Sequence, residues 1–303
     1  MNKFKGSAAM IAATVLWGTA FSAQSSGMRY IGPMLFTALR SLIAVPALLA
    51  VMIALDLFAG RKVSLWGETQ SKEAQKKLLA GGFWCGLVIA AAAICQQAGL
   101  QYTTAGKTGF LTALYIIIVP MLGIFFKRKT GLMLWISALL ALAGSALLCG
   151  GLGSLGKGEI LVIICAGIYS VHILVIDHYA PSCDCIRLSC LQFAVATPIA
   201  ALASLAAGES WHPDGILASW PFWLYCGAGS GAAAFTLQMI SQKYLHPVTA
   251  SLLMSLESVF AVLGGWLFLN ERLSAREMAG CAVIFAAIIL SQVKISSIRR
   301  KKD

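Results

Sequence analysis

Three charged residues lie within long apolar stretches of the sequence: Arg40, Lys107 and Glu257. A charge at the centre of a bilayer costs about 2.5–3.5 kcal/mol in insertion measurements, so such residues usually face a polar path inside a protein. Glu257 has no cation beside it in the sequence, and burial disfavours the charged form of a carboxylate. Glu257 is therefore predicted to exchange a proton or to hold a cationic group of a solute. The alternative is a structural role, as an ion pair with Lys107 or Arg40 or as a protonated, hydrogen-bonded carboxyl.

The two basic residues each have a functional and a structural interpretation. Lys107 stands at the start of an apolar stretch, and Tyr115 follows eight residues later on the same face of a helix. Lys107 could receive a solute carboxylate, or its side chain could extend to the membrane surface. The guanidinium of Arg40 could contact a solute, although a structural contact with backbone carbonyls or a helix end is favoured.

Several uncharged polar or aromatic residues could line the same path. Tyr169 and His172 are three residues apart and share a helix face, where they could form an aromatic wall with a titratable imidazole. The alternative for His172 is a hydrogen-bonded packing group. Buried glutamines either line a cavity or join helices by hydrogen bonds. The full set is Trp17, Gln96, Gln97, Tyr169, His172 and Gln238.

The composition shows which elements must position these residues. The chain has 303 residues, of which 59% are hydrophobic and 12% charged, against roughly 25% charged in soluble domains. Apolar runs of about twenty residues span a bilayer as helices at 1.5 Å per residue. The sequence therefore predicts an all-α integral membrane protein with ten transmembrane helices. Their expected ranges are Ala8–Gln24, Pro33–Leu55, Leu78–Ala98, Gly106–Phe126, Leu132–Gly151, Glu159–Asp177, Ile186–Ala206, Trp220–Ser241, Val248–Leu269 and Met278–Val293.

The basic residues indicate the orientation of the chain. Most Lys and Arg fall in the N-terminus, the even-numbered loops and the C-terminal tail, including Lys127–Lys129 and Arg299–Lys302. By the positive-inside rule both termini are predicted to be cytoplasmic. The net charge of +11 follows from this sidedness and from attraction to anionic lipid, so the bilayer is the expected partner and nucleic acid is not.

The two halves of the sequence correspond to each other. A shift of 142 residues aligns Tyr115 with Glu257, and a shift of 152 residues aligns Pro46 with Pro198. Tyr115 and Glu257 are therefore expected at equivalent places near the middle of the membrane. Because each half holds five helices, an odd number, the second half must enter the membrane inverted relative to the first.

This pattern predicts two inverted five-helix repeats, residues 1–151 and 152–303. Secondary transporters use such repeats, with the substrate site between them and alternating access by rocking of one repeat against the other. Only one loop is longer than about twenty residues, and no GxxxxGK[ST] motif for nucleotide binding occurs.

Other function classes lack their characteristic residues. Cys183, Cys185 and Cys190, with His178 nearby, match no standard zinc spacing, so neither a metal nor another cofactor is expected. An enzyme would need a nucleophile, an acid and a base that converge, and a passive channel would need a filter-like ring or carbonyl loop. A membrane-embedded enzyme and a channel therefore remain only as alternatives to a transporter.

Short motifs along the chain resemble the drug/metabolite transporter (DMT) superfamily, specifically its EamA-type members. These motifs are Trp17-Gly18, Arg40, Pro120 and LFLNERLSAREMAG at Leu267–Gly280. The acidic residue that the family usually carries in both halves is matched by Glu271, whereas the first half has Lys129 at the corresponding place. This departure from the family pattern indicates that the segment around Glu271 marks a helix end and loop and has no direct chemical role.

The resemblance implies a secondary transporter of small organic metabolites, amino-acid-like or related, moved outward across the bacterial inner membrane, with no enzymatic activity. A proton-coupled exporter of drugs with the same fold is the alternative. The implied partner is a small-molecule substrate. A homodimer is compatible with the sequence but is not inferred from it.

Overall fold

The computed structural model describes residues 3–67, 71–125, 131–149, 156–269 and 274–292, and every regular element within them is a helix. One of these is a short 3₁₀ helix, η1, and one is a π-helix, η2. In chain order the elements are α1 (Lys3–Gly27), α2 (Pro33–Phe58), α3 (Lys72–Leu100), α4 (Ala105–Thr112), α5 (Tyr115–Phe125), α6 (Leu132–Cys149), α7 (Lys157–Tyr179), η1 (Ala180–Ser182), α8 (Cys185–Ala206), α9 (Pro213–Ala218), α10 (Trp220–Tyr225), η2 (Cys226–Ala234), α11 (Phe235–Gln242), α12 (Pro247–Met254), α13 (Leu256–Leu269) and α14 (Ala275–Gln292).

The prediction of an all-helical membrane protein is confirmed. Within the described residues, seven segments are long and apolar enough to cross a bilayer, and two shorter apolar helices cover 132–147 and 278–290. The segment predicted as the span Trp220–Ser241 consists of α10, η2 and α11 in succession. The predicted fourth and ninth spans are each divided in two, into α4 and α5 and into α12 and α13.

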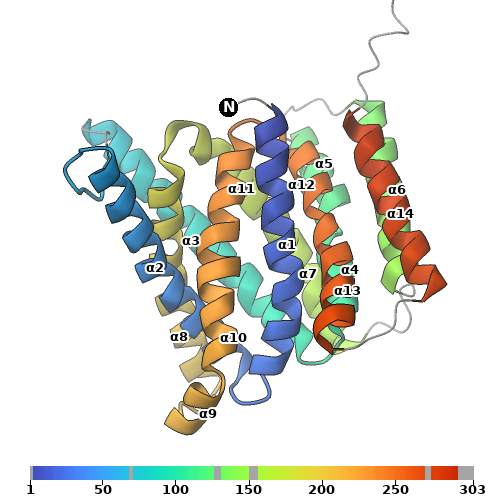
Figure 1. Ribbon diagram of the computed structural model, residues 1–303, viewed down its shortest axis with the longest axis horizontal. Coiled ribbons are helices and arrows are strands. Elements are labelled where there is room, and N and C mark those ends of the chain that lie inside the picture. Colours follow the sequence, from blue (N-terminus) through green and yellow to red (C-terminus); the bar gives the residue numbers. More distant parts are fainter. Residues whose placement is uncertain (1–2, 68–70, 126–130, 150–155, 270–273, 293–303) are drawn as a thin grey trace, which may run out of the picture.

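The helices pack so that segments from the two halves of the sequence alternate in space. α2 lies against α8 at one edge of the molecule, α6 lies against α14 at the opposite edge, and α1 is central (Figure 1). α1 also packs against α13, and α3 packs against α7. Each of these four pairs joins a helix before residue 151 to a helix after it, so the two halves are interleaved.

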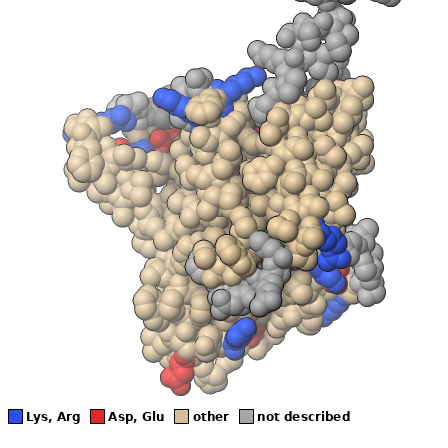
Figure 2. All heavy atoms as spheres, turned by 45° about the vertical axis from the view of Figure 1, so that its right-hand side comes forward, with Lys and Arg blue, Asp and Glu red and all other residues tan. Residues whose placement is uncertain are grey.

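The surface carries its charges at two opposite ends. On the face in Figure 2, Lys, Arg, Asp and Glu gather at the upper and lower ends, and the band between them is uncharged. Large apolar side chains on the described helices are about half exposed or more, for example those of Leu42, Ile164 and Leu202. Such a band matches the hydrocarbon core of a bilayer, where exposure of apolar side chains is favourable.

The two divided helices break at corresponding positions. The Ile116 N–H donates to the Ala113 carbonyl at 3.0 Å, and 142 residues later the Ser258 N–H donates to the Ser255 carbonyl at 3.1 Å. These three-residue hydrogen bonds tighten the chain into a turn between α4 and α5 and between α12 and α13. Each turn contains a side chain singled out from the sequence, Tyr115 in one half and Glu257 in the other.

The π-helix η2 packs closely against α2. A Cβ atom on Gly227 would lie 2.6 Å from the Arg40 carbonyl and 2.8 Å from the Ile43 Cβ, so only glycine permits this approach. The small residues of η2 therefore form a close-packing surface, in agreement with their interpretation from the sequence.

Candidate functional site

A small cavity lies between the helices of the two halves of the chain. Its volume is about 30 Å³, room for roughly two water molecules. The side chains that line the cavity fill most of the space between these helices. The lining residues are Trp17, Gln24, Arg40, Gln96, Thr112, Tyr115, Tyr169, Ser230, Phe235, Met254 and Glu257.

Glu257 and Tyr115 meet in this cavity. The Tyr115 hydroxyl donates a long hydrogen bond of 3.5 Å to Glu257 Oε2, and the two residues are 142 apart in sequence. Both are buried, with 1% of Tyr115 and 8% of Glu257 exposed. Glu257 lies in the first turn of α13, where the positive end of the helix dipole favours a carboxylate. The two side chains aligned by the repeat are therefore direct neighbours.

Arg40 brings the opposite charge to the same cavity. It lies on α2, is partly buried, and makes no hydrogen bond or ion pair with another described residue. Glu257 likewise forms no ion pair within the described part of the chain. Lys107, which was considered as its partner, pairs with Glu159 at 3.7 Å. The constitutive ion pair considered for Glu257 is thus not formed in this conformation. The cavity thus contains a guanidinium and a carboxyl group, neither of which forms an ion pair with another described residue.

Aromatic and amide groups form the rest of the wall. Trp17 donates its Nε1–H to the Ser230 carbonyl of η2 at 3.2 Å, and its ring meets the Phe235 ring edge-on, with centroids 4.9 Å apart. The Tyr169 hydroxyl donates to Gln96 Oε1 at 3.4 Å, and Gln96 Nε2 donates to the Thr112 hydroxyl at 3.2 Å. These contacts hold the rings and the amide in place around the two charges.

Comparison with known proteins identifies the fold. A family model described as the EamA-like transporter family matches residues 4–150 and, a second time, residues 156–292. The chain belongs to this family. It is 27% identical over 227 residues, 71% of this chain and 69% of the relative, to an uncharacterized transporter of Archaeoglobus fulgidus. A crystal structure described only as that of a protein superposes with a TM-score of 0.74 at 22% identity, over 95% of this chain and 96% of the other, which shows a shared fold. The protein is thus a multi-pass membrane transporter of the EamA-like family.

The structure brings together six of the ten residues that the sequence nominated for the site of this transporter. They are Trp17, Arg40, Gln96, Tyr115, Tyr169 and Glu257. The other four lie outside the lining.

Each of the four has another environment. Lys107 lies in the first turn of α4 with 38% of its side chain exposed and pairs with Glu159. His172 is fully buried one turn from Tyr169, with its Nε2 2.8 Å from the Gln192 Oε1 and its ring against Phe235. Gln238 donates to the sulfur of Met254, at 3.8 Å. Gln97 is also buried and does not line the cavity.

Five lining residues were missed by the sequence reasoning. Gln24 is 3% exposed, and its Oε1 has no hydrogen-bond partner among the described residues. Thr112 and Met254 correspond to each other in the 142-residue register and are the last residues before the helix breaks. That register was a signal that could have found them. Ser230 contributes a backbone carbonyl and Phe235 a ring, neither of which stands out in an apolar sequence.

The two residues used to compare the family motif in each half, Lys129 and Glu271, lie outside the described residues.

Proposed function

We propose that this EamA-family protein is a secondary transporter of small organic metabolites that carry both a cationic and an anionic group. The observation that carries the proposal is the presence of Arg40 and Glu257, without an ion pair between them, in one cavity inside the membrane. A charge is expensive in that environment unless it has a partner. A substrate with an ammonium and a carboxylate group, such as an amino acid, supplies both partners at once.

The remaining wall suits the apolar part of such a substrate. The rings of Trp17, Tyr115, Tyr169 and Phe235 surround the charged groups. Aromatic faces bind both apolar side chains and cations. We therefore place the substrate ammonium at Glu257 and Tyr115, the carboxylate at Arg40, and the side chain among the rings.

Transport would proceed by alternating access to a site shared by two inverted repeats, residues 1–151 and 152–303. Equivalent contacts in the two halves support this division. Gln96 donates to Thr112 and Gln238 donates to Met254, the same pair of positions in the 142-residue register. The small cavity between helices of the two halves is where the substrate would bind in such a cycle.

Membrane, orientation and direction complete the proposal. The excess of Lys and Arg in the predicted cytoplasmic segments supports cytoplasmic termini. The resemblance to EamA-type exporters supports outward movement across a bacterial inner membrane. No cofactor takes part in this mechanism, although the cycle can be coupled to protons.

A second candidate function is the proton-coupled export of drugs or other xenobiotics. It is favoured by the position of Glu257, a buried carboxylate that has a hydroxyl as its only hydrogen-bond partner among the described residues. A carboxylate in this place can take up a proton from one side and release it to the other. In this mechanism a cationic drug and a proton compete for Glu257.

Counterflow in proteoliposomes tests the first function. Vesicles with the purified protein, loaded with an unlabelled mixture of amino acids, should accumulate ¹⁴C-labelled amino acids from outside with saturable kinetics. Protein-free vesicles are the control. Uptake that never saturates and shows no counterflow would indicate a channel, and accumulation of cationic dyes driven only by a pH gradient would indicate the drug exporter.

A further inference from the structure

α2 and α8 are joined by polar contacts at both ends of the molecule. We propose that this pair, with η2 packed on α2, is the fixed part of the transporter: α2 and α8 keep their mutual contacts throughout the cycle while the broken helices α4–α5 and α12–α13 move. This inference rests on the transport function proposed above. It makes the Arg40 end of the cavity stationary and the Glu257 end mobile.

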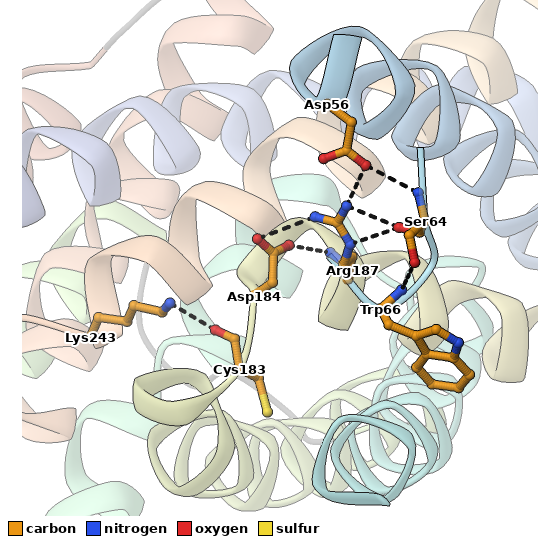
Figure 3. A network of polar contacts seen from close by, with 7 residues as sticks. All are labelled: Asp56, Ser64, Trp66, Cys183, Asp184, Arg187 and Lys243. Atoms are coloured by element: carbon orange, nitrogen blue, oxygen red, sulfur yellow. Dashed lines mark hydrogen bonds and ion pairs between the residues drawn. The ribbon is translucent and has the colours of Figure 1, made fainter. Parts of the chain in front are cut away.

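The upper end of the pair in Figure 1 is closed by a buried ion pair. Arg187, in the first turn of α8, places Nη2 2.6 Å from Oδ2 of Asp56, in the last turn of α2 (Figure 3). Only 6% of Arg187 and 3% of Asp56 are exposed. Removing one partner of such a pair leaves an uncompensated buried charge, so separation of the two helices at this end is costly.

The same guanidinium also holds the loop that follows α2. Arg187 Nε and Nη2 donate to the Ser64 carbonyl at 3.1 and 3.0 Å, and Nη1 lies 3.5 Å from Asp184 (Figure 3). Gly67 packs on the guanidinium, because a Cβ there would lie 2.9 Å from it. Three segments of chain are therefore fastened at one residue.

The lower end of the pair is closed by a carboxylate. Glu209, which follows α8, accepts the backbone N–H groups of Met34 at 3.0 Å and Leu35 at 2.6 Å, in the first turn of α2. α2 begins after Gly32, which has no capping side chain, so Glu209 provides the cap from the other half of the chain. The Ser204 hydroxyl also donates to Glu209, at 2.8 Å.

The contact between the two broken helices is different in kind. A Cβ on Gly109 of α4 would be 3.8 Å from the Ala261 Cβ of α13, and the Ser258 hydroxyl donates to the Gly109 carbonyl at 3.2 Å. No ion pair between α4 and α13 occurs in the described residues. Small residues and a neutral hydrogen bond allow one helix to slide past the other more readily than a buried ion pair does.

Two disulfides distinguish a fixed contact from a moving one. The first is Gly32→Cys with Glu209→Cys, since a Cβ at residue 32 would lie 2.7 Å from Cγ of Glu209, where the new sulfur would sit. The second is Gly109→Cys with Ala261→Cys, whose Cβ separation of 3.8 Å is typical of a disulfide. Both are made in a variant with its nine cysteines replaced by Ser. Each protein is assayed by ¹⁴C-amino-acid counterflow after oxidation and again after reduction.

We expect the oxidised 32–209 protein to keep at least half of its reduced rate. The oxidised 109–261 protein should lose more than 90% of its rate and regain it on reduction. Loss of transport in the oxidised 32–209 protein, restored by reduction, would overturn the proposal.

A measurement without substrate separates this inference from the proposed function. Nitroxide labels at the exposed positions Leu42 and Leu202 report the distance between α2 and α8, and labels at Ile124 and Trp266 report the distance between α5 and α13. In nanodiscs, double electron–electron resonance should give one distance population for the first pair and more than one for the second. Two populations between Leu42 and Leu202 would refute a fixed pair, whether or not amino acids are transported.

Discussion

The two broken helices share a backbone design and differ in chemistry. Each has a three-residue turn, and the turns are 142 residues apart. One turn contains Tyr115 and is preceded by Thr112, and the other contains Glu257 and is preceded by Met254. Near-identical geometry therefore presents two hydroxyls from one half and a carboxylate and a thioether from the other.

This difference shows that charge is divided unequally between the halves. Arg40 aligns with Gln192 in the 152-residue register, so the cation of the cavity comes from the first half and the anion from the second. A symmetric fold can alternate between two equivalent conformations, whereas a dipolar substrate needs two different ends in its site. In the proposed mechanism, the shared turns would serve the motion and the unequal side chains would serve substrate recognition.

Among the predicted changes, removal of the Glu257 carboxylate should have the largest effect on substrate affinity. Glu257→Gln keeps the size of the side chain but loses its charge, and a hydrogen bond to a charged group contributes about 1.5–3 kcal/mol. We expect the affinity for amino acids, measured by equilibrium dialysis or scintillation proximity, to fall about 10- to 100-fold.

Glu159→Gln is the matched control, because it makes the same chemical change at a residue outside the cavity lining. Equal losses in the two variants would show that the cavity carboxylate has no special role.

Arg40→Gln makes the first half resemble the second, because Gln192 is its counterpart. We expect about a tenfold loss of affinity for amino acids, since the carboxylate loses a charge-assisted hydrogen bond. Affinity for the corresponding amines, which lack the carboxylate, should change less than twofold. If the amines lost affinity to the same extent as the amino acids, Arg40 would not be the carboxylate partner.

Tyr115→Phe tests the hydroxyl opposite Glu257. Because their hydrogen bond is long, at 3.5 Å, we expect a loss of about 0.5–1.5 kcal/mol, or roughly two- to tenfold in affinity. Isothermal titration of the purified protein with the amino acid that shows counterflow would measure it. A loss as large as that of Glu257→Gln would make the two side chains equal partners and contradict the asymmetry.

The smallest effects should come from the paired glutamines. Gln96 lines the cavity and Gln238 does not, so Gln96→Leu should weaken binding a few-fold and Gln238→Leu less than twofold. Each should lower the free energy of unfolding by only about 0.6 kcal/mol, the typical value for a hydrogen bond between membrane helices. Thermal shifts of both variants in one detergent provide the comparison. A larger binding defect in Gln238→Leu would move the site toward α11 and α12, which the Gln238–Met254 contact joins.

Much of the site was accessible from the sequence because it follows from the repeat. The 142-residue register predicted equivalent places for Tyr115 and Glu257 near the middle of the membrane, and in the structure a hydrogen bond of 3.5 Å joins them. Lys107 shows where this reasoning ends. Its spacing from Tyr115 predicted that both lie on one face of one helix. In the structure a break in the helix separates Lys107 from Tyr115, and the Lys107 ammonium pairs with Glu159 of the other half of the chain. A helical periodicity does not continue through a turn.

The sequence alone determined that this protein is a helical membrane protein, where most of its helices lie, and which two residues occupy equivalent places in its halves. Hydropathy and internal similarity fix these features because both depend only on local composition and residue spacing. The tertiary structure decided that Arg40 and Glu257 share a cavity without forming an ion pair. It also decided that Glu209, from the second half of the chain, caps the N-terminus of α2 in the first half. Such contacts depend on how interleaved helices are rotated and how closely they approach, which the spacing of residues along the chain does not specify.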